Sequence, residues 1–165
     1  MKISIILLDK HHSRANFKCE EPSLTRYITT QVNQDIRRKL AVCYVAVNEK
    51  QDVIAYYTLS SESLGRHLIP DKYIKKVPQN YDAPVILLGR LARDLSVKGT
   101  GLGEHLLLDA LFRSYRLSEE SIGAMAVVVD PISRKAADYY EKYGFEHLSD
   151  SSKMFLPMKV IKQLM

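Results

Sequence analysis

The chain has 165 residues, of which 46% are hydrophobic and 26% are charged. This length suits one compact domain, and this composition excludes a disordered chain. No stretch approaches the roughly 18 apolar residues that a membrane-spanning helix needs, and the apolar start of the chain is too short for a signal peptide. We therefore expect a cytoplasmic protein with no membrane partner. The net charge of +5 favours an anionic partner but does not establish one.

The two cysteines, Cys19 and Cys43, form neither a disulfide framework nor a metal site. Cys43 lies inside an apolar run and is expected in the core, whereas Cys19 lies in a polar approach to a helix. No histidine stands near either cysteine in the sequence. We therefore expect neither to act as a nucleophile.

The first third of the chain predicts a strand, a helix and a hairpin. Residues 2–8 indicate the strand, and Ser23 is placed to cap a helix over residues 24–39. Apolar side chains then recur every four residues, as on one face of an amphipathic helix. These are Leu24, Ile28, Val32, Ile36 and Leu40. The β-rich runs at 41–47 and 53–60, joined by a polar turn, predict the hairpin.

The rest of the chain alternates between strands and helices. Residues 61–84 contain three prolines and predict a loop with a short helix near Lys72–Lys76. The further expected elements are a strand at 84–97, a helix from about Gly101, a strand at 123–130, a helix at 133–144 closed by Gly144 in the C′ position, two short strands at 145–148 and 153–158, and a last helical turn. This order predicts one domain, 1–165, with a mixed α/β sheet and helices on both faces.

The run Lys98-Gly99-Thr100-Gly101-Leu102-Gly103 lies between a predicted strand and a predicted helix. Its glycines allow a tight turn that points several N–H groups at one place, and the helix adds the positive end of its dipole. Such a site suits a phosphate or pyrophosphate. A P-loop would need a lysine after the glycines, and a dinucleotide fingerprint would need glycine where Glu104 or Leu106 stands. The alternative to an anion-binding site is a glycine turn that only connects the strand to the helix.

The loop resembles the pyrophosphate loop [Q/R]-x-x-G-x-[G/A] of the GCN5-related N-acetyltransferases (GNATs). Gly101 and Gly103 match its glycines, and Lys98 stands where glutamine or arginine is usual. The segment AADYYEKYGF (136–145) is similar to the A-x-x-[FY]-Y-x-x-x-G-F segment of that family. The resemblance is strong over residues 85–147. It implies the GNAT fold, which has a mixed, mostly antiparallel central sheet with a parallel, splayed strand pair and helices on both faces.

A narrower resemblance links the chain to the GNAT toxins of bacterial toxin–antitoxin pairs. The similar stretches are FKCEEPSLTRYI (17–28), IAYYTLSSESL (54–64), PVILLGRLARD (84–94), GLGEHLLLDAL (101–111) and AMAVVVD (124–130). Glu20 stands where these toxins usually have glycine, and Thr25 where they have aspartate. The resemblance implies acetylation of the α-amino group of aminoacyl-tRNA, which blocks translation. It also implies a homodimer and a cognate antitoxin of the ribbon-helix-helix type.

The family resemblance implies which residues hold acetyl-CoA, the acetyl donor, with no metal. The acetyl group is expected between the strands at Leu87–Asp94 and Ala124–Asp130. Backbone N–H groups of the first strand hold the carbonyl and the pantetheine arm, the glycine loop holds the pyrophosphate, and the start of the last helix touches the coenzyme. The implied residues are Leu91, Ala92, Arg93, Lys98, Gly99, Thr100, Gly101, Leu102, Gly103, Ser133 and Ala136.

Tyr140 is the implied general acid, since the family places this tyrosine beside the thioester, where it protonates the leaving thiolate. Tyr139 and Tyr143 are interpreted as packing residues. No general base stands out, because His67, His105 and His147 are better interpreted as surface residues. A free α-amino group has a pKa of about 7.7–8.0 and a lysine one of about 10.4, so the missing base favours an α-amine substrate.

Cationic side chains are expected to contact the tRNA backbone on the acceptor side of the cleft. The candidates are Arg37, Arg38, Lys39, Lys75, Lys76 and Arg90, with Lys72 and Arg93 beside them. Helix-dipole partners and solvated surface are the simpler explanation for each one alone. Two other functions stay open at this point. One is an acetyltransferase of a small amine or a protein amine, and the other is a non-catalytic acetyl-CoA-binding module in a repressor complex.

Overall fold

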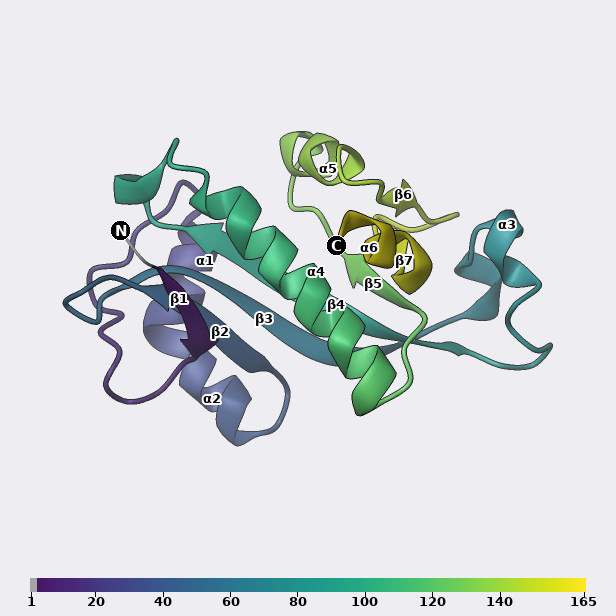
Figure 1. Ribbon diagram of the computed structural model, residues 1–165, viewed down its shortest axis with the longest axis horizontal. Helices are drawn as coiled ribbons and strands as arrows, with labels where there is room; N and C mark the ends of the chain where they lie inside the picture. Colours follow the sequence, from purple (N-terminus) through teal and green to yellow (C-terminus); the bar gives the residue numbers. More distant parts are fainter. Residues whose placement is uncertain (1–2) are drawn as a thin grey trace. The chain divides into compact units, whose positions relative to one another are not determined.

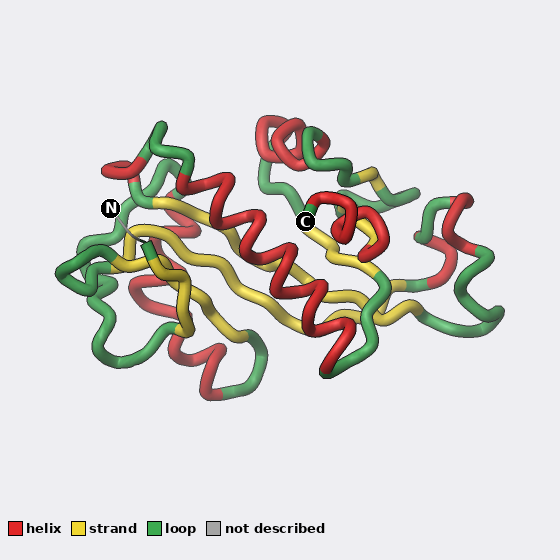
Figure 2. Tube along the Cα trace, viewed as in Figure 1, coloured by secondary structure: helices red, strands yellow, loops and turns green. Residues whose placement is uncertain are grey.

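The computed structural model describes residues 3–165, so Lys2 of the predicted first strand lies outside the described residues. Figure 1 labels the main helices and strands, and Figure 2 distinguishes them by type. The elements in chain order are β1 (Ser4–Leu7), α1 (Pro22–Arg26), η1 (Tyr27–Gln31), α2 (Val32–Arg37), β2 (Val42–Val47), β3 (Val53–Leu64), η2 (Arg66–Leu68), α3 (Asp71–Ile74), β4 (Ala83–Arg93), η3 (Leu95–Val97), α4 (Leu102–Glu120), β5 (Ala126–Val129), α5 (Arg134–Glu141), β6 (Glu146–His147), β7 (Met154–Pro157) and α6 (Met158–Leu164). Here η1 is a π-helical turn, and η2 and η3 are 3₁₀ turns.

The strands form one seven-stranded sheet in the order β1-β2-β3-β4-β5-β7-β6. The pairs β1–β2, β2–β3, β5–β7 and β6–β7 are antiparallel. Strands β4 and β5 are parallel, with Ile86 opposite Val127 and Leu87 opposite Val128. This arrangement confirms the mixed sheet that the sequence predicts, and it confirms the mostly antiparallel order with one parallel pair that the family resemblance implies.

The described chain divides into two compact units. Unit 1 contains the residues up to Ser60 together with Leu88–Ala110, and unit 2 contains Ser61–Leu87 and Leu111–Met165. The strands β3 and β4 and the helix α4 each begin in one unit and end in the other.

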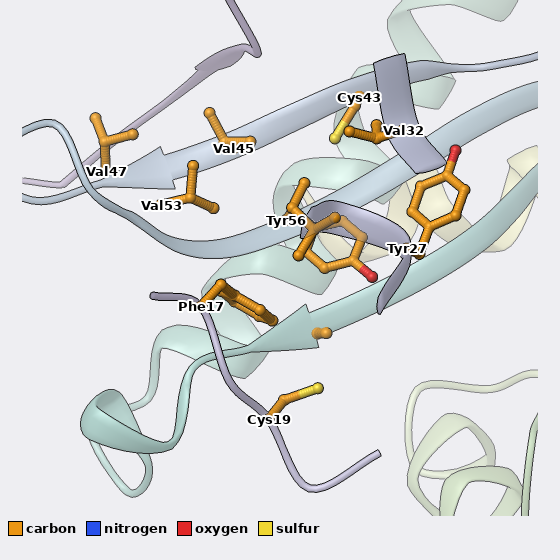
Figure 3. Packing of buried hydrophobic residues seen from close by; sticks show 11 residues of the cluster. Phe17, Cys19, Tyr27, Val32, Cys43, Val45, Val47, Val53 and Tyr56 are labelled. Atoms are coloured by element: carbon orange, nitrogen blue, oxygen red, sulfur yellow. The ribbon is translucent and has the colours of Figure 1, made fainter. Parts of the chain in front are cut away.

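Unit 1 has helices on both faces of its strands because side chains alternate along a strand. On one face, Val45 of β2 and Tyr56 of β3 belong to a buried cluster with Val32 of the helical segment 22–37 (Figure 3). On the other face, the Tyr57 hydroxyl donates a hydrogen bond of 2.6 Å to Asp109 of α4. Adjacent residues of β3 therefore face opposite helices, as the sequence predicts.

Both cysteines are buried in unit 1. Cys43 lies in the core as expected, and burial raises the pKa of its thiol to about 12. Cys19 was placed in a polar segment by the sequence, but it is buried at the edge of the same cluster. Its Sγ contacts the Glu21 carbonyl at 3.3 Å and the Thr25 hydroxyl at 3.4 Å. Among residues 3–165, no group of three or more His, Cys, Asp or Glu side chains could hold a metal ion.

The first helix begins earlier than predicted, and the prediction of Ser23 as its N-cap is wrong. Glu21 occupies the N-cap position and Pro22 the first turn, where a missing N–H group costs nothing. The Ser23 hydroxyl donates to the Glu21 carboxylate at 3.2 Å instead. The sequence favours Ser23 because serine side chains suit caps, but Pro22 fits the first turn and moves the cap to Glu21.

A π-helical turn interrupts the same helix at Tyr27–Gln31. The Thr29 hydroxyl donates to the Thr25 carbonyl at 2.9 Å, and the Thr30 hydroxyl donates to the Arg26 carbonyl at 2.7 Å. Such side-chain bonds compete with the helical ladder and favour a local irregularity. The predicted apolar stripe is buried at its centre, whereas its last member, Leu40, lies beyond the helix and is 57% exposed.

Unit 2 has its own core, which β4, β5 and β7 form with the segment between β3 and β4. Phe155 of β7 is fully buried in it, and the ring centres of Phe155 and Tyr73 from α3 are 5.8 Å apart. The other buried members are Leu64, Ile69, Val77, Ala83, Val85, Ala126, Val128 and Leu148. The short helix α3 confirms the one predicted near Lys72–Lys76, although it begins at Asp71.

Several predicted boundaries shift by a few residues. The strand predicted at 84–97 ends at Arg93, because the Asp94 side chain accepts a hydrogen bond from the Ser96 N–H and caps the turn η3. The helix predicted over 133–144 spans Arg134–Glu141. Gly144 does adopt the left-handed conformation, with φ of 98°, but it lies two residues after the C-cap Lys142. Such shifts reflect local side-chain bonds that apolar periodicity does not show.

Candidate functional site

The glycine loop of unit 1 follows the end of β4 and opens α4 (Figure 1). Asp94 fixes its entry: the carboxylate accepts hydrogen bonds from the Ser96 N–H at 2.9 Å and the Lys18 N–H at 2.7 Å. Partial burial raises the pKa of Asp94, but these hydrogen bonds outweigh it and hold the pKa below its usual value. The Thr100 hydroxyl then donates to the Val97 carbonyl at 2.6 Å. The loop is therefore built by side-chain bonds of its own sequence.

Two loop glycines have a backbone that other residues rarely adopt. Gly99 has φ of 79° and Gly101 has φ of 85°, both in the left-handed region. Gly103, the second glycine that matches the family's loop, lies in α4 with no positive φ, so the backbone there does not require glycine. A Cβ added at any of the three would meet no atom within 4 Å. The space above the loop therefore leaves room for a ligand at the N-terminus of a 19-residue helix.

Two cations flank this loop and share one carboxylate. The two terminal guanidinium nitrogens of Arg93 each donate to the Glu20 carboxylate at 3.1 Å, and the Lys98 ammonium lies 3.8 Å from the same carboxylate. Sequence reasoning did not assign Glu20 to the site. The sequence does contain one indication of its importance: Glu20 stands where the similar toxins usually have glycine.

The helix α5 of unit 2 carries the predicted acid. Ser133 caps this helix, with its hydroxyl accepting a hydrogen bond from the Ala136 N–H at 3.1 Å. The Tyr140 ring packs edge-on against Phe145 at 5.3 Å and against Tyr139 at 5.7 Å. These contacts fix the orientation of the ring without using its hydroxyl.

Burial raises the pKa of Tyr140 to about 12. Its hydroxyl therefore stays protonated at neutral pH, which a proton donor requires. Tyr143 packs against Tyr139 at 5.4 Å, as expected for an aromatic cluster. The roles of the three tyrosines in catalysis remain predictions.

The three histidines considered as bases are all exposed. His147 lies 2.7 Å from the carboxylate of Glu141, the residue that follows Tyr140. His67 lies in the turn η2, and His105 lies in the first turns of α4. These positions agree with surface residues, and the structure adds no reason to assign a base among them.

The backbone at Lys39, at the cationic end of α2, helps to terminate this helix. This residue has φ of 61°, a left-handed conformation that usually favours glycine. The Lys39 N–H bonds to the Ile36 carbonyl at 3.1 Å, and the Leu40 N–H bonds to the Asp35 carbonyl at 2.9 Å. This pair of bonds is a Schellman motif that closes the helix. The side chains of Arg37, Arg38 and Lys39 are exposed.

The other cations predicted to bind tRNA are distributed over both units. Arg90 of unit 1 stacks on the Tyr27 ring, with its guanidinium carbon 3.7 Å from the ring centre, a cation–π contact. Lys72 of unit 2 forms an ion pair of 3.2 Å with Glu146. Lys75 and Lys76 follow in the same unit. The structure therefore gives Arg90 and Lys72 partners within the protein.

The structure groups the predicted coenzyme residues in two sets. Unit 1 brings together Leu91–Arg93 of β4 and the loop Lys98–Gly103. Unit 2 holds Ser133, Ala136 and Tyr140 at α5. The roles of both sets in binding acetyl-CoA stay predictions.

The mixed sheet with its β4–β5 parallel pair, the glycine loop at the start of α4 and the tyrosine-bearing α5 define a GNAT-type acyltransferase. No protein-family model matches the chain. It is 33% identical to the tRNA-acetylating toxin of Mycobacterium tuberculosis, over 79% of this chain and 76% of the toxin. It is 28% identical to a protein of Sinorhizobium fredii named probable toxin TacT, over 93% of this chain and 90% of that protein.

Solved structures give the same result. A variant of KacT that carries phenylalanine in place of a tyrosine matches with a TM-score of 0.91 and 27% identity, over 100% of both chains. AtaT complexed with acetyl-methionyl-tRNAfMet matches with a TM-score of 0.89 and 29% identity, over 99% of both chains. The chain therefore belongs to the family of GNAT toxins of toxin–antitoxin systems, among which are the tRNA-acetylating toxins.

Proposed function

We propose that this protein transfers the acetyl group of acetyl-CoA to the α-amino group of an aminoacyl-tRNA. The observation that carries the proposal is the open glycine loop at the start of α4, with Gly99 and Gly101 in left-handed conformations. Family membership supports the rest. AtaT is solved with acetyl-methionyl-tRNAfMet, and AtaTR is solved with acetyl-CoA.

In this proposal the amine attacks the thioester carbonyl, a C–N bond forms, and the C–S bond breaks. Backbone N–H groups at Leu91–Arg93 bind the donor, and the loop Lys98–Gly103 binds its pyrophosphate. The Tyr140 hydroxyl gives its proton to the leaving thiolate and regains one from water. The amine loses its own proton to solvent. No base is required, since the pKa of a free α-amino group is about 7.7–8.0 and an adjacent ester lowers it.

We further propose that the cations predicted from the sequence bind the phosphates of the acceptor stem. Arg37, Arg38 and Lys39 end one helix, with Arg90 in the same unit and Lys75 and Lys76 in the other. Binding through phosphate neutralisation weakens linearly with the logarithm of salt concentration. The KM for aminoacyl-tRNA should therefore rise steeply with salt, while the KM for acetyl-CoA should change less.

Replacing both Arg37 and Arg38 with alanine should flatten the salt dependence of the KM for aminoacyl-tRNA by up to about two phosphate contacts. Steady-state kinetics over a salt series measures this slope. Lys39→Gly is a useful companion variant, because it removes the third charge and suits the left-handed backbone. The control is Lys50→Ala in the hairpin turn, which should leave the slope unchanged. An unchanged slope in the double variant would remove this helix end from the tRNA site.

The partners follow from the same family. The variant AtaT toxin is solved bound to the C-terminus of the antitoxin AtaR, and KacTA is solved with DNA. We propose that this chain also binds a cognate antitoxin, of the ribbon-helix-helix type, and that it forms a homodimer.

We propose that the protein acts in the cytoplasm. We also propose that residues 1–165 form one domain, because β3, β4 and α4 run through both units. No helix within residues 3–165 is long and apolar enough to cross a membrane.

Mass spectrometry of the protein incubated with acetyl-CoA and charged tRNA tests the proposal. We expect an acetyl group on the amino acid of the charged tRNA, and arrest of growth when the protein is expressed alone. A free aminoacyl ester should be a far poorer substrate. If the free ester reacts as well as the charged tRNA, the protein is an acetyltransferase of small amines. Binding of acetyl-CoA with no turnover of any amine would indicate a binding module instead.

A further inference from the structure

The segment that carries Glu20 is fixed against the end of β4. The Lys18 N–H donates to the Asp94 carboxylate at 2.7 Å, and the Leu95 N–H donates to the Lys18 carbonyl at 2.9 Å. The side chains on either side of Lys18, Phe17 and Cys19, point into the core of unit 1 (Figure 3). The backbone leading to Glu20 is therefore held by two hydrogen bonds and two buried side chains.

Thr25 holds the same segment from the helix side. Its Oγ1 accepts a hydrogen bond from the Cys19 N–H at 3.0 Å. Glu20 thus follows a residue that is bonded at its backbone and buried at its side chain. These contacts fix the backbone at Glu20 and so place its side chain opposite Arg93. A side chain on an unsupported surface loop would not be held in this way.

Glu20 contacts the two cations that lie nearest the glycine loop in the sequence. The contact with Arg93 is bidentate, with both N–O distances at 3.1 Å, a geometry that adds strength and orientation. Lys98, the first residue of the loop, has its ammonium 3.8 Å from the same carboxylate. The hydrogen bonds from Arg93 and from the backbone hold the pKa of Glu20 below its usual value, so it is charged at neutral pH.

We propose that Glu20 is an intramolecular anion that competes with the coenzyme's phosphates for Arg93 and Lys98 and so sets the affinity for acetyl-CoA. This inference rests on the proposed binding of the pyrophosphate at the loop Lys98–Gly103. A coenzyme phosphate that approaches the loop meets cations already neutralised by a carboxylate, and it meets the negative charge of that carboxylate. A toxin with glycine at this position has no such carboxylate.

The expected size of the effect is modest, because the pair is partly exposed. The side chain of Glu20 is 51% exposed and that of Arg93 is 24% exposed, and solvent screening makes the contribution of exposed ion pairs small. Two such contacts and the repulsion of a phosphate should together weaken binding by about threefold to tenfold. The competition therefore adjusts the affinity without preventing binding.

Glu20→Gln tests the proposal, because it removes the charge and keeps a side chain that can accept from Arg93. Calorimetry should show that acetyl-CoA binds about threefold to tenfold more tightly to this variant than to the natural protein. Acetyl-pantetheine, which has the thioester but no phosphate, should bind both proteins equally. Glu49→Gln, in the hairpin turn of the same unit, is the matched control for the change in net charge and should leave both affinities unchanged.

A double-mutant cycle with Lys98→Gln identifies the mechanism. If Glu20 acts by masking these cations, its removal should tighten binding less when Lys98 is already gone. The proposal is overturned if Glu20→Gln weakens acetyl-CoA binding or leaves it unchanged, since Glu20 would then only orient Arg93. Equal tightening of acetyl-pantetheine also overturns it. If the natural protein, Glu20→Gln and Lys98→Gln all fail to bind acetyl-CoA while folded, the loop assignment fails, and this inference fails with it.

Discussion

Tyr140→Phe is expected to lower kcat by about 100-fold or more while the affinity for acetyl-CoA stays near that of the natural protein. The change removes only the hydroxyl, and the ring contacts with Phe145 and Tyr139 use the ring alone. The thiolate would then leave without a proton donor, which raises the barrier of the chemical step. Steady-state kinetics with charged tRNA, combined with calorimetry of acetyl-CoA binding, measures both quantities.

Tyr143→Phe is the matched control, because Tyr143 belongs to the same aromatic cluster through its contact with Tyr139. It should keep most of the activity. If Tyr140→Phe retains more than about half of the natural turnover, Tyr140 is not the acid, and Tyr139 becomes the next residue to test.

The pH dependence of kcat is an independent test of the role of Tyr140. A tyrosine that acts as an acid works in its protonated form, so its contribution is lost only as the pH rises through its pKa. Burial raises the pKa of Tyr140 to about 12. The kcat of the natural protein should therefore show no alkaline loss from this residue up to about pH 10.

Gly101→Asp is expected to weaken acetyl-CoA binding by at least about 100-fold, beyond easy detection. The aspartate places a negative charge where the loop is proposed to meet a pyrophosphate. It also adds a Cβ to a residue with φ of 85°, which costs about 1–2 kcal/mol. The fold should survive, because the loop is exposed and an added Cβ meets no atom within 4 Å.

Gly101→Asn separates charge from backbone strain. Asparagine has the same shape as aspartate and tolerates the left-handed conformation better than most residues. Calorimetry should show that this variant keeps measurable affinity, while thermal unfolding should show both variants folded. Unchanged affinity in the aspartate variant would place the pyrophosphate elsewhere.

The sequence predicts where the glycine loop lies, but it predicts only part of the backbone conformation of the loop. Its composition and its position before an amphipathic helix indicated an anion site, and the spacing separated it from P-loops and dinucleotide folds. The sequence could not show that Gly99 and Gly101, and not Gly103, take the left-handed conformation. That depends on hydrogen bonds such as the one from Thr100 to the Val97 carbonyl, which fix the turn only after it folds.

Helix ends and irregularities were predicted less well than strands. The buried strands around Val45, Tyr56 and Val128 were indicated by runs of apolar and β-branched residues. The π-helical turn at Tyr27–Gln31 was not, because an apolar repeat of four residues fits an ordinary helix as well. Hydrogen bonds from threonine hydroxyls accompany it, and these leave little trace in a hydrophobic pattern.

The sequence by itself determined the order of strands and helices and the position of the glycine loop, because each depends on local composition and on spacing along the chain. Its resemblance to known proteins indicated the type of sheet and the family. Only the tertiary structure decided which distant residues meet. Glu20 and Arg93 are 73 positions apart, and Tyr57 and Asp109 are 52 apart. Contacts over such separations depend on packing of the whole chain, since no local pattern encodes which carboxylate faces which cation. The pairing of Glu20 with Arg93 and Lys98 beside the glycine loop is therefore a property of the fold.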